Sequence, residues 1–188
     1  MDTLAHGLWG GAVFGQASRR QWKWAFWLGM MPDLLSFGPF FVYRAPVIFQ
    51  RWSHHLFGPP ERRLIPSYVY HAYHVTHSLV MWAAMSSVCY GTWLCRHPRT
   101  PDTRSLAFRY AVTPARALWP LGAWGLHILC DIPTHSIRFF PTPYLWPFRT
   151  PFYDGTPWAR PRFMILNYLA IALTYAALAA YRKAKQYP

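Results

Sequence analysis

The chain has 188 residues, of which 53% are hydrophobic, 19% are aromatic and only 13% are charged. This composition is too apolar for a typical soluble domain, and the length suits one domain rather than two. The formal net charge of +13 predicts an anionic partner, either lipid headgroups or nucleic acid. Mean hydropathy is only +0.03, so the apolar residues must be concentrated in segments.

Five apolar stretches predict membrane-crossing helices, since a span needs roughly 20 predominantly apolar residues. In chain order they cover residues 4–17, 24–43, 67–95, 117–135 and 163–181. The last stretch is the clearest because it contains no charged residue, whereas the first is short and rich in glycine. We therefore predict an all-α fold, a polytopic transmembrane bundle of about five helices forming one membrane-embedded domain over residues 1–188.

The first stretch carries glycines four positions apart, at Gly7, Gly11 and Gly15. On a helix they form a smooth stripe that allows another backbone to approach closely. His6 adjoins this stripe, so close packing would bring its ring toward the centre of the bundle.

The connections between the stretches are basic or rich in proline. Residues 137–161 alternate proline with aromatic residues and cannot form a regular helix, because proline removes a donor and restricts its neighbour. We expect an interfacial loop here, with Phe139 to Trp158 acting as a lid. The basic residues flank apolar segments, so membrane lipids are the expected anionic partner. Nucleic acid remains an alternative.

Two runs place polar residues in apolar segments, where they are costly unless they bind something. In the run from His127 through Asp131 to His135 the polar residues are four apart and share one helical face. The other run has His71, His74 and His77 at spacings of three. With five spans, both runs and the acidic residue of the second stretch reach the same half of the bundle.

Imidazole nitrogens and carboxylate oxygens around an open position are the donors of a hydrolytic metal site. A mixed His and Asp set suits zinc, manganese or iron, and the ion lowers the pKa of bound water toward about 7. There are more candidates than one tetrahedral ion requires, so either two ions share the site or some residues orient the ligands. The candidates are His6, Asp33, His74, His77, His127, Asp131 and His135.

Four short motifs occur in order along the chain: Thr3-Leu-Ala-His6, Pro32-Asp33, Thr76-His77-Ser78 and His127-Ile-Leu-Cys-Asp131. This combination resembles a bacterial family of inner-membrane metal-dependent hydrolases, the LexA-regulated type. It is more distantly similar to the zinc-dependent phospholipase C and nuclease P1 group. The resemblance implies a multi-pass protein of the bacterial inner membrane with His6, Asp33, His77, His127 and Asp131 as metal-site residues.

One departure from the family concerns the residues before the Thr-His-Ser motif. The family often has a His-Arg pair where this chain has Ala72 and Tyr73, so His71 or His74 would have to replace the upstream ligand.

These observations predict a hydrolase in which metal-bound hydroxide attacks a phosphoester or another ester, of a lipid or a small molecule. His77, His127 and Asp131 would be core ligands, with Asp33 a ligand or a bridging carboxylate. Catalytic roles fall to His74 or His135 as proton carriers and to Arg138, which would hold a phosphate or reach lipid headgroups. The sequence does not fix the oligomeric state.

Several other readings use the same residues. A metal transporter or sensor would need the same ligands, although no polar track crosses the other half of the bundle. Bis-histidine haem ligation conflicts with the nearby carboxylates. A structural hydrogen-bonded network is a further alternative, in which Asp33 caps a helix after Pro32 and Asp131 caps a turn.

Overall fold

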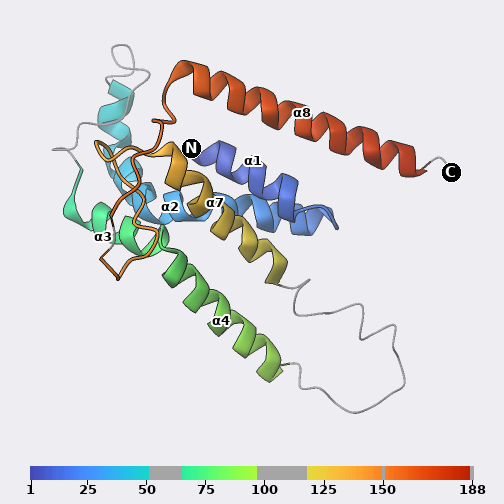
Figure 1. Cartoon of the computed structure of the whole chain (residues 1–188), viewed down its shortest axis with the longest axis horizontal. Coiled ribbons are helices and arrows are strands. Elements are labelled where there is room, and N and C mark those ends of the chain that lie inside the picture. Colours follow the sequence, from blue (N-terminus) through green and yellow to red (C-terminus); the bar gives the residue numbers. More distant parts are fainter. Residues whose placement is uncertain (51–64, 97–117, 150, 187–188) are drawn as a thin grey trace.

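The computed structural model describes residues 1–50, 65–96, 118–149 and 151–186, and every regular element within these ranges is helical (Figure 1). The prediction of an all-α fold is therefore confirmed for the described part of the chain. The elements are α1 (Thr3–Phe14), α2 (Arg19–Gln50), α3 (Ser67–Thr76), α4 (Leu79–Arg96), the short 3-10 helix η2 (Trp119–Leu121), α7 (Gly122–Thr134) and α8 (Pro161–Gln186).

Helices α1 and α2 form a tight antiparallel hairpin. The side chain of Asp2 caps α1 by accepting a hydrogen bond from the backbone N–H of Ala5. The glycines of α1 lie against α2, since a Cβ added at Gly7 would come within 2.7 Å of Met30. The approach is equally close from the other side, where a Cβ added at Gly29 would lie 2.6 Å from the carbonyl oxygen of His6. The predicted close packing of the glycine stripe is thus confirmed.

The 67–95 stretch is broken in the middle, so the structure corrects the prediction of one continuous helix. Helices α3 and α4 are bent by 61° relative to each other at His77 and Ser78. The Ser78 hydroxyl accepts hydrogen bonds from the backbone N–H groups of Val80 and Met81, which starts α4. The backbone N–H of Leu79 donates to the carbonyl of Tyr144 in the proline-rich segment, which holds the bend from outside.

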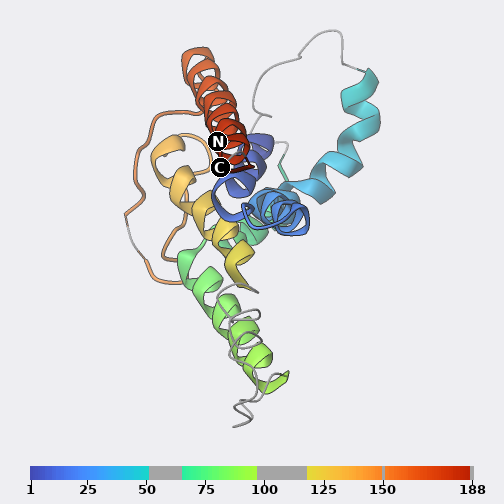
Figure 2. The ribbon, with the colours of Figure 1, turned by 90° about the vertical axis from the view of Figure 1, so that its right-hand side faces the viewer.

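Helix α1 is also bordered by α7 and α8 (Figure 2). Helix α7 runs antiparallel to α1, because Thr134 contacts the N-terminal amino group while Ala123 lies against Gly10. Helix α8 runs parallel to α1, as three hydrogen bonds at a nearly constant offset show: Tyr168 to Asp2, Tyr175 to Leu8 and Arg182 to Gln16.

Two helices are long and apolar enough to cross a membrane, Arg19–Arg44 within α2 and Pro161–Lys185 within α8. The bent pair α3 and α4 adds a third if it counts as one span. Helix α8 exposes large apolar side chains such as Leu166, Leu169 and Leu173, as expected of a helix in lipid. The structure therefore indicates a membrane protein.

Helices α1 and α7 have 12 and 13 residues, or about 18–20 Å of rise, and are shorter than a hydrocarbon core of about 30 Å. The prediction of five spans is not confirmed for this reason. These two helices instead lie between the longer ones, and they carry three of the five predicted metal-site residues, His6, His127 and Asp131.

The proline-rich segment lacks regular structure in its described part, as its prolines predict. It lies against α3, where the hydroxyl of Tyr73 donates to the carbonyl of Phe140. It also returns to the end of α7, where the backbone N–H of Gly155 donates to the carbonyl of His135. The segment thereby covers the end of the bundle at which α7 finishes.

Candidate metal centre

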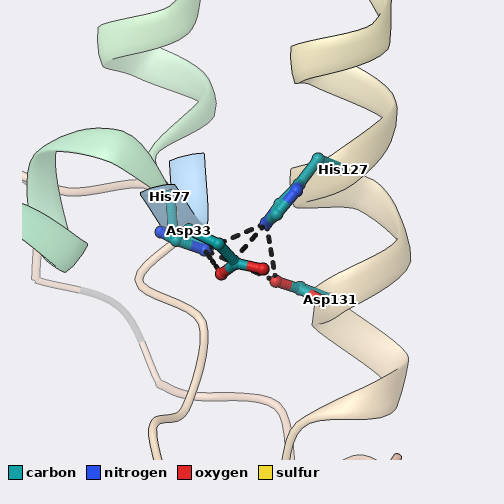
Figure 3. A group of neighbouring side chains, drawn as sticks. All are labelled: Asp33, His77, His127 and Asp131. Carbon is teal, nitrogen blue, oxygen red and sulfur yellow. Dashed lines mark hydrogen bonds and ion pairs between the residues drawn. The ribbon is translucent and has the colours of Figure 1, made fainter. Parts of the chain in front are cut away.

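Four side chains from three parts of the chain meet in the interior (Figure 3). Asp33 lies midway along α2, which continues through Pro32 without a break. His77 is the residue that ends α3, and His127 and Asp131 are one turn apart on α7. His77, His127 and Asp131 are essentially inaccessible to solvent, and the side chain of Asp33 is 13% exposed.

The ligand atoms of these residues are spaced as donors around one ion. Nε2 of His127 lies 3.1 Å from Nε2 of His77, 3.2 Å from Oδ2 of Asp131 and 3.7 Å from Oδ1 of Asp33. Nε2 of His77 lies 3.4 Å from Oδ1 of Asp33 and 3.5 Å from Oδ2 of Asp131. A tetrahedral site with zinc–ligand bonds of about 2.0–2.2 Å has donors about 3.3–3.6 Å apart. The five distances, 3.1–3.7 Å, lie around this range, so the four residues could hold one tetrahedral ion.

Hydrogen bonds on the far side of each ring orient the two histidines. Nδ1 of His127 lies 2.7 Å from the carbonyl oxygen of Gly29, which can only accept, so Nδ1 carries the proton. Nδ1 of His77 lies 2.9 Å from the hydroxyl of Thr76, which also reaches the carbonyl of Tyr73 at 3.5 Å. When that hydroxyl donates to Tyr73, it accepts from Nδ1 of His77. In the neutral rings both Nε2 atoms then point lone pairs at each other, the arrangement that a metal ligand needs.

The carboxylate of Asp131 provides a further sign that the group fits a cation. Its Oδ2 atom is buried and makes no hydrogen bond. Burial lowers the pKa of His127, but Asp131 and Asp33 outweigh this effect and raise it, as expected of a ring that faces two carboxylates. A divalent ion held by the group would supply positive charge to both carboxylates and would give Oδ2 a partner.

A second layer of polar groups holds the outer oxygens of the two carboxylates. The hydroxyl of Thr3 donates to Oδ2 of Asp33 at 2.7 Å. Oδ1 of Asp131 lies 2.8 Å from Nε2 of His6 and also contacts the amino group of Met1. The His6 ring stacks on His127 with centroids 3.5 Å apart, so it supports the group from α1.

His135 lies at the edge of the group. Its Nδ1 is 3.6 Å from Oδ1 of Asp131 and 3.4 Å from the hydroxyl of Thr142. The ring also lines a small cavity of about 80 Å³ together with Phe139 and Trp158 of the proline-rich segment. This volume has room for about two or three water molecules.

Three ionisable groups of this cluster lie on α1 or at the end of α7, outside the candidate spans. Burial lowers the pKa of His6 to about 3 and that of His135 to about 4, so both rings are neutral at physiological pH. Burial raises the pKa of Asp131, but His135, His6 and the N-terminal ammonium outweigh it and hold that pKa well below its usual range. A neutral imidazole and an ionised carboxylate are the forms that bind metals.

The structure thus brings together four of the five predicted metal residues: Asp33, His77, His127 and Asp131. His6 lies against Asp131 rather than within the group of four, so its role as a ligand stays a prediction. His74 is half-buried on α3 and Arg138 is exposed, and neither has a contact with the group of four among the described residues. The suggestion that Asp33 caps a helix is wrong, because α2 runs through it.

Sequence reasoning missed the residues that support the ligands. Thr3 and Thr76 are part of the four motifs but had no assigned role. The hydroxyl of Thr76 directly before His77 was an available signal, whereas nothing local pairs Thr3 with Asp33, thirty residues away. The carbonyl of Gly29 left no signal, because any residue type supplies a backbone carbonyl.

Comparisons with protein-family models, with curated proteins and with solved structures gave no match to this chain. The inferences about function therefore rest on the residues and their geometry.

Proposed function

We propose that this chain is a membrane-bound, metal-dependent hydrolase that cleaves a phosphoester or another ester at the membrane interface. The observation that supports it most is the convergence of two imidazole Nε2 atoms and two carboxylate oxygens at tetrahedral distances in a buried site. The resemblance of the four sequence motifs adds the reaction class and a location in the bacterial inner membrane, as a multi-pass protein.

A divalent ion in such a site, zinc first and manganese or iron as alternatives, supplies a water of lowered pKa and polarises an ester oxygen. The neighbouring residues of the chain hold and orient the ligand side chains. Gly29 and Thr76 keep the Nε2 atoms of His127 and His77 directed at the site. His6 occupies the outer oxygen of Asp131 and so leaves Oδ2 for the site.

Under this proposal, water and substrate approach from the side of His135. The small cavity lined by its ring lies next to the group of four, because Nδ1 of His135 is 3.6 Å from Oδ1 of Asp131. Under this proposal His135 positions water beside Asp131, and the proline-rich segment covers the opening. Arg138 lies exposed three residues further on, where it would meet a phosphate that approaches from the headgroup region.

One observation favours a second function, a non-enzymatic metal-binding protein such as a sensor or transporter. Four protein donors complete a tetrahedral shell, and closed shells are typical of structural zinc, whereas catalytic zinc keeps a position for water. Hydrolysis requires a fifth position. Under the hydrolase proposal that position faces the cavity beside His135.

The experiment compares metal content and turnover in the full chain purified in detergent. Inductively coupled plasma mass spectrometry gives the metal content of the wild type, His127→Ala and Asp131→Ala. His71→Ala is the matched control, because His71 is exposed and bonds only to Ser67 of its own helix among described residues. Turnover is measured in mixed micelles with bis(p-nitrophenyl) phosphate and p-nitrophenyl butyrate, with and without added zinc.

We expect about one bound ion and zinc-dependent hydrolysis of one probe in the wild type and in His71→Ala, with both lost in the two ligand variants. Bound metal without turnover of either probe would favour the sensor or transporter. Near-zero metal in all four proteins would refute the metal site and leave the hydrogen-bonded network.

A further inference from the structure

A basic cavity lies away from the metal centre, where the loop between α1 and α2 meets the last turns of α8. Its volume is about 390 Å³, and it opens about 15 Å along α1 from His6. Its cationic lining residues are Arg19, Lys23 and Arg182, and Gln16, Ser18 and Trp22 complete most of the wall. Figure 1 shows the start of α2 and the C-terminal part of α8 on the same side of the molecule.

We propose that this cavity binds the phosphate-bearing headgroup of an anionic phospholipid. The inference is independent of the proposed hydrolase. Every ion pair among the described residues involves Asp33 or Asp131, and none involves the three cations of the cavity. The positive charge is therefore left for an external anion.

The cavity is organised before a ligand binds. Nη2 of Arg182 donates to Oε1 of Gln16 at 2.7 Å. The amide nitrogen of Gln16 in turn donates to the carbonyls of Gly11 and Ala12, so α1 fixes one edge of the guanidinium. A guanidinium has five N–H donors, and those on its other edge remain for the paired oxygens of a phosphate.

The opposite wall is also fixed. Nε1 of Trp22 donates to the hydroxyl of Tyr175 at 3.0 Å, and that hydroxyl donates to the carbonyl of Leu8 at 2.8 Å. These bonds tie α2 and α8 to α1 just beside the cavity, so the helices that carry the three cations keep their relative positions. The hydroxyl of Ser18 accepts from the backbone N–H of Gln21 and caps α2, whose positive end then faces the cavity.

The position of the cavity favours a lipid over a soluble phosphate. Arg19 begins one candidate span and Arg182 lies near the end of the other. Both arginines are therefore at the depth of the lipid headgroups. Trp24 and Trp27 are 55% and 51% exposed on α2 beside it, as in the aromatic belt of a membrane interface.

The test uses native mass spectrometry of the full chain released from nanodiscs that contain equal phosphatidylglycerol and phosphatidylcholine. The variants are the double change Arg19→Gln with Arg182→Gln and the single change Lys23→Gln, whose exposed side chain makes no hydrogen bond or ion pair among the described residues. Arg162→Gln is the matched control, an exposed arginine at the other end of α8. Circular dichroism melting verifies that each variant is folded, and a separate arm adds inorganic phosphate.

We expect the wild type and Arg162→Gln to retain phosphatidylglycerol over phosphatidylcholine, and Lys23→Gln to weaken that retention about 5-fold and the double variant more than 10-fold. Equal retention of the two lipids by the wild type would overturn the proposal. So would unchanged retention in folded Lys23→Gln together with the double variant. Displacement of the lipid by millimolar inorganic phosphate would assign the cavity to a soluble phosphate instead.

Discussion

Replacing Gly29 with alanine should disturb the metal centre although no ligand is changed. The new Cβ would lie 2.6 Å from the carbonyl oxygen of His6, and ordinary contacts begin at about 3.4 Å, so α1 and α2 would have to separate by roughly 0.8 Å. The obstacle is backbone, which cannot rotate away. The Gly29 carbonyl is also the acceptor that fixes the tautomer of His127.

The expected change in the free energy of unfolding follows from two opposing effects. Alanine in place of glycine in a helix contributes about 1 kcal/mol of stability, whereas overpacking of this kind costs about 1–3 kcal/mol. We expect a net loss of about 1 kcal/mol, which lowers Tm by about 2–4 °C in a chain of this size. Loss of support for a ligand lowers metal affinity about 10- to 100-fold.

The assay measures Tm by tryptophan fluorescence in detergent and zinc affinity by competition with a chromophoric chelator. Gly38→Ala is the matched control, since Gly38 lies on the same helix and nothing lies within 4 Å of its added Cβ. It should leave zinc affinity unchanged and Tm equal or higher. If Gly29→Ala behaves like Gly38→Ala in both measurements, the close approach of α1 does not support the centre.

Three further predictions use simpler changes. Thr3→Val removes the donor to Asp33 and should weaken zinc binding about 10-fold by competition titration, whereas Thr3→Ser should retain it; equal affinities would contradict the assigned bond. Trp124→Phe removes the donor to the Thr76 carbonyl and should reduce the free energy of unfolding by about 1 kcal/mol, which lowers Tm by a few degrees. An unchanged Tm would show that this hydrogen bond does not stabilise the fold. Treating the wild type with a strong zinc chelator should lower its Tm, whereas Asp131→Ala should show no further shift; an equal shift in both would mean that the stabilising metal lies elsewhere.

The sequence predicted the residues of the centre better than the path of the chain. The four-residue spacing of His127 and Asp131 places both on one helical face whatever the fold does, so this pair was readable. The convergence of Asp33 and His77 with that pair followed from counting segments, although two of those segments are too short to span. Counting segments still placed these residues in the same half of the bundle, because successive short helices also alternate in direction.

The bend at His77 was not predicted: Ser78 caps α4 locally, but a contact far away in the sequence also holds the bend. Leu79 donates its N–H to Tyr144, more than sixty residues away, and no local pattern announces such a bond. The three-residue spacing of His71, His74 and His77 predicted a shared cluster, yet only His77 reaches the centre. It does so because α3 ends there.

The four donors of the centre belong to segments that are far apart in the sequence. More than forty residues separate Asp33 from His77, and a similar interval separates His77 from His127. An ion held by all of them acts as a cross-link that closes two long loops at once, much as a disulfide does. By the chain-entropy relation, closing one loop of this length disfavours the unfolded ensemble by about 4 kcal/mol. Metal loss would then weaken how firmly α2, α3 and α7 are held together, in addition to removing the proposed chemistry.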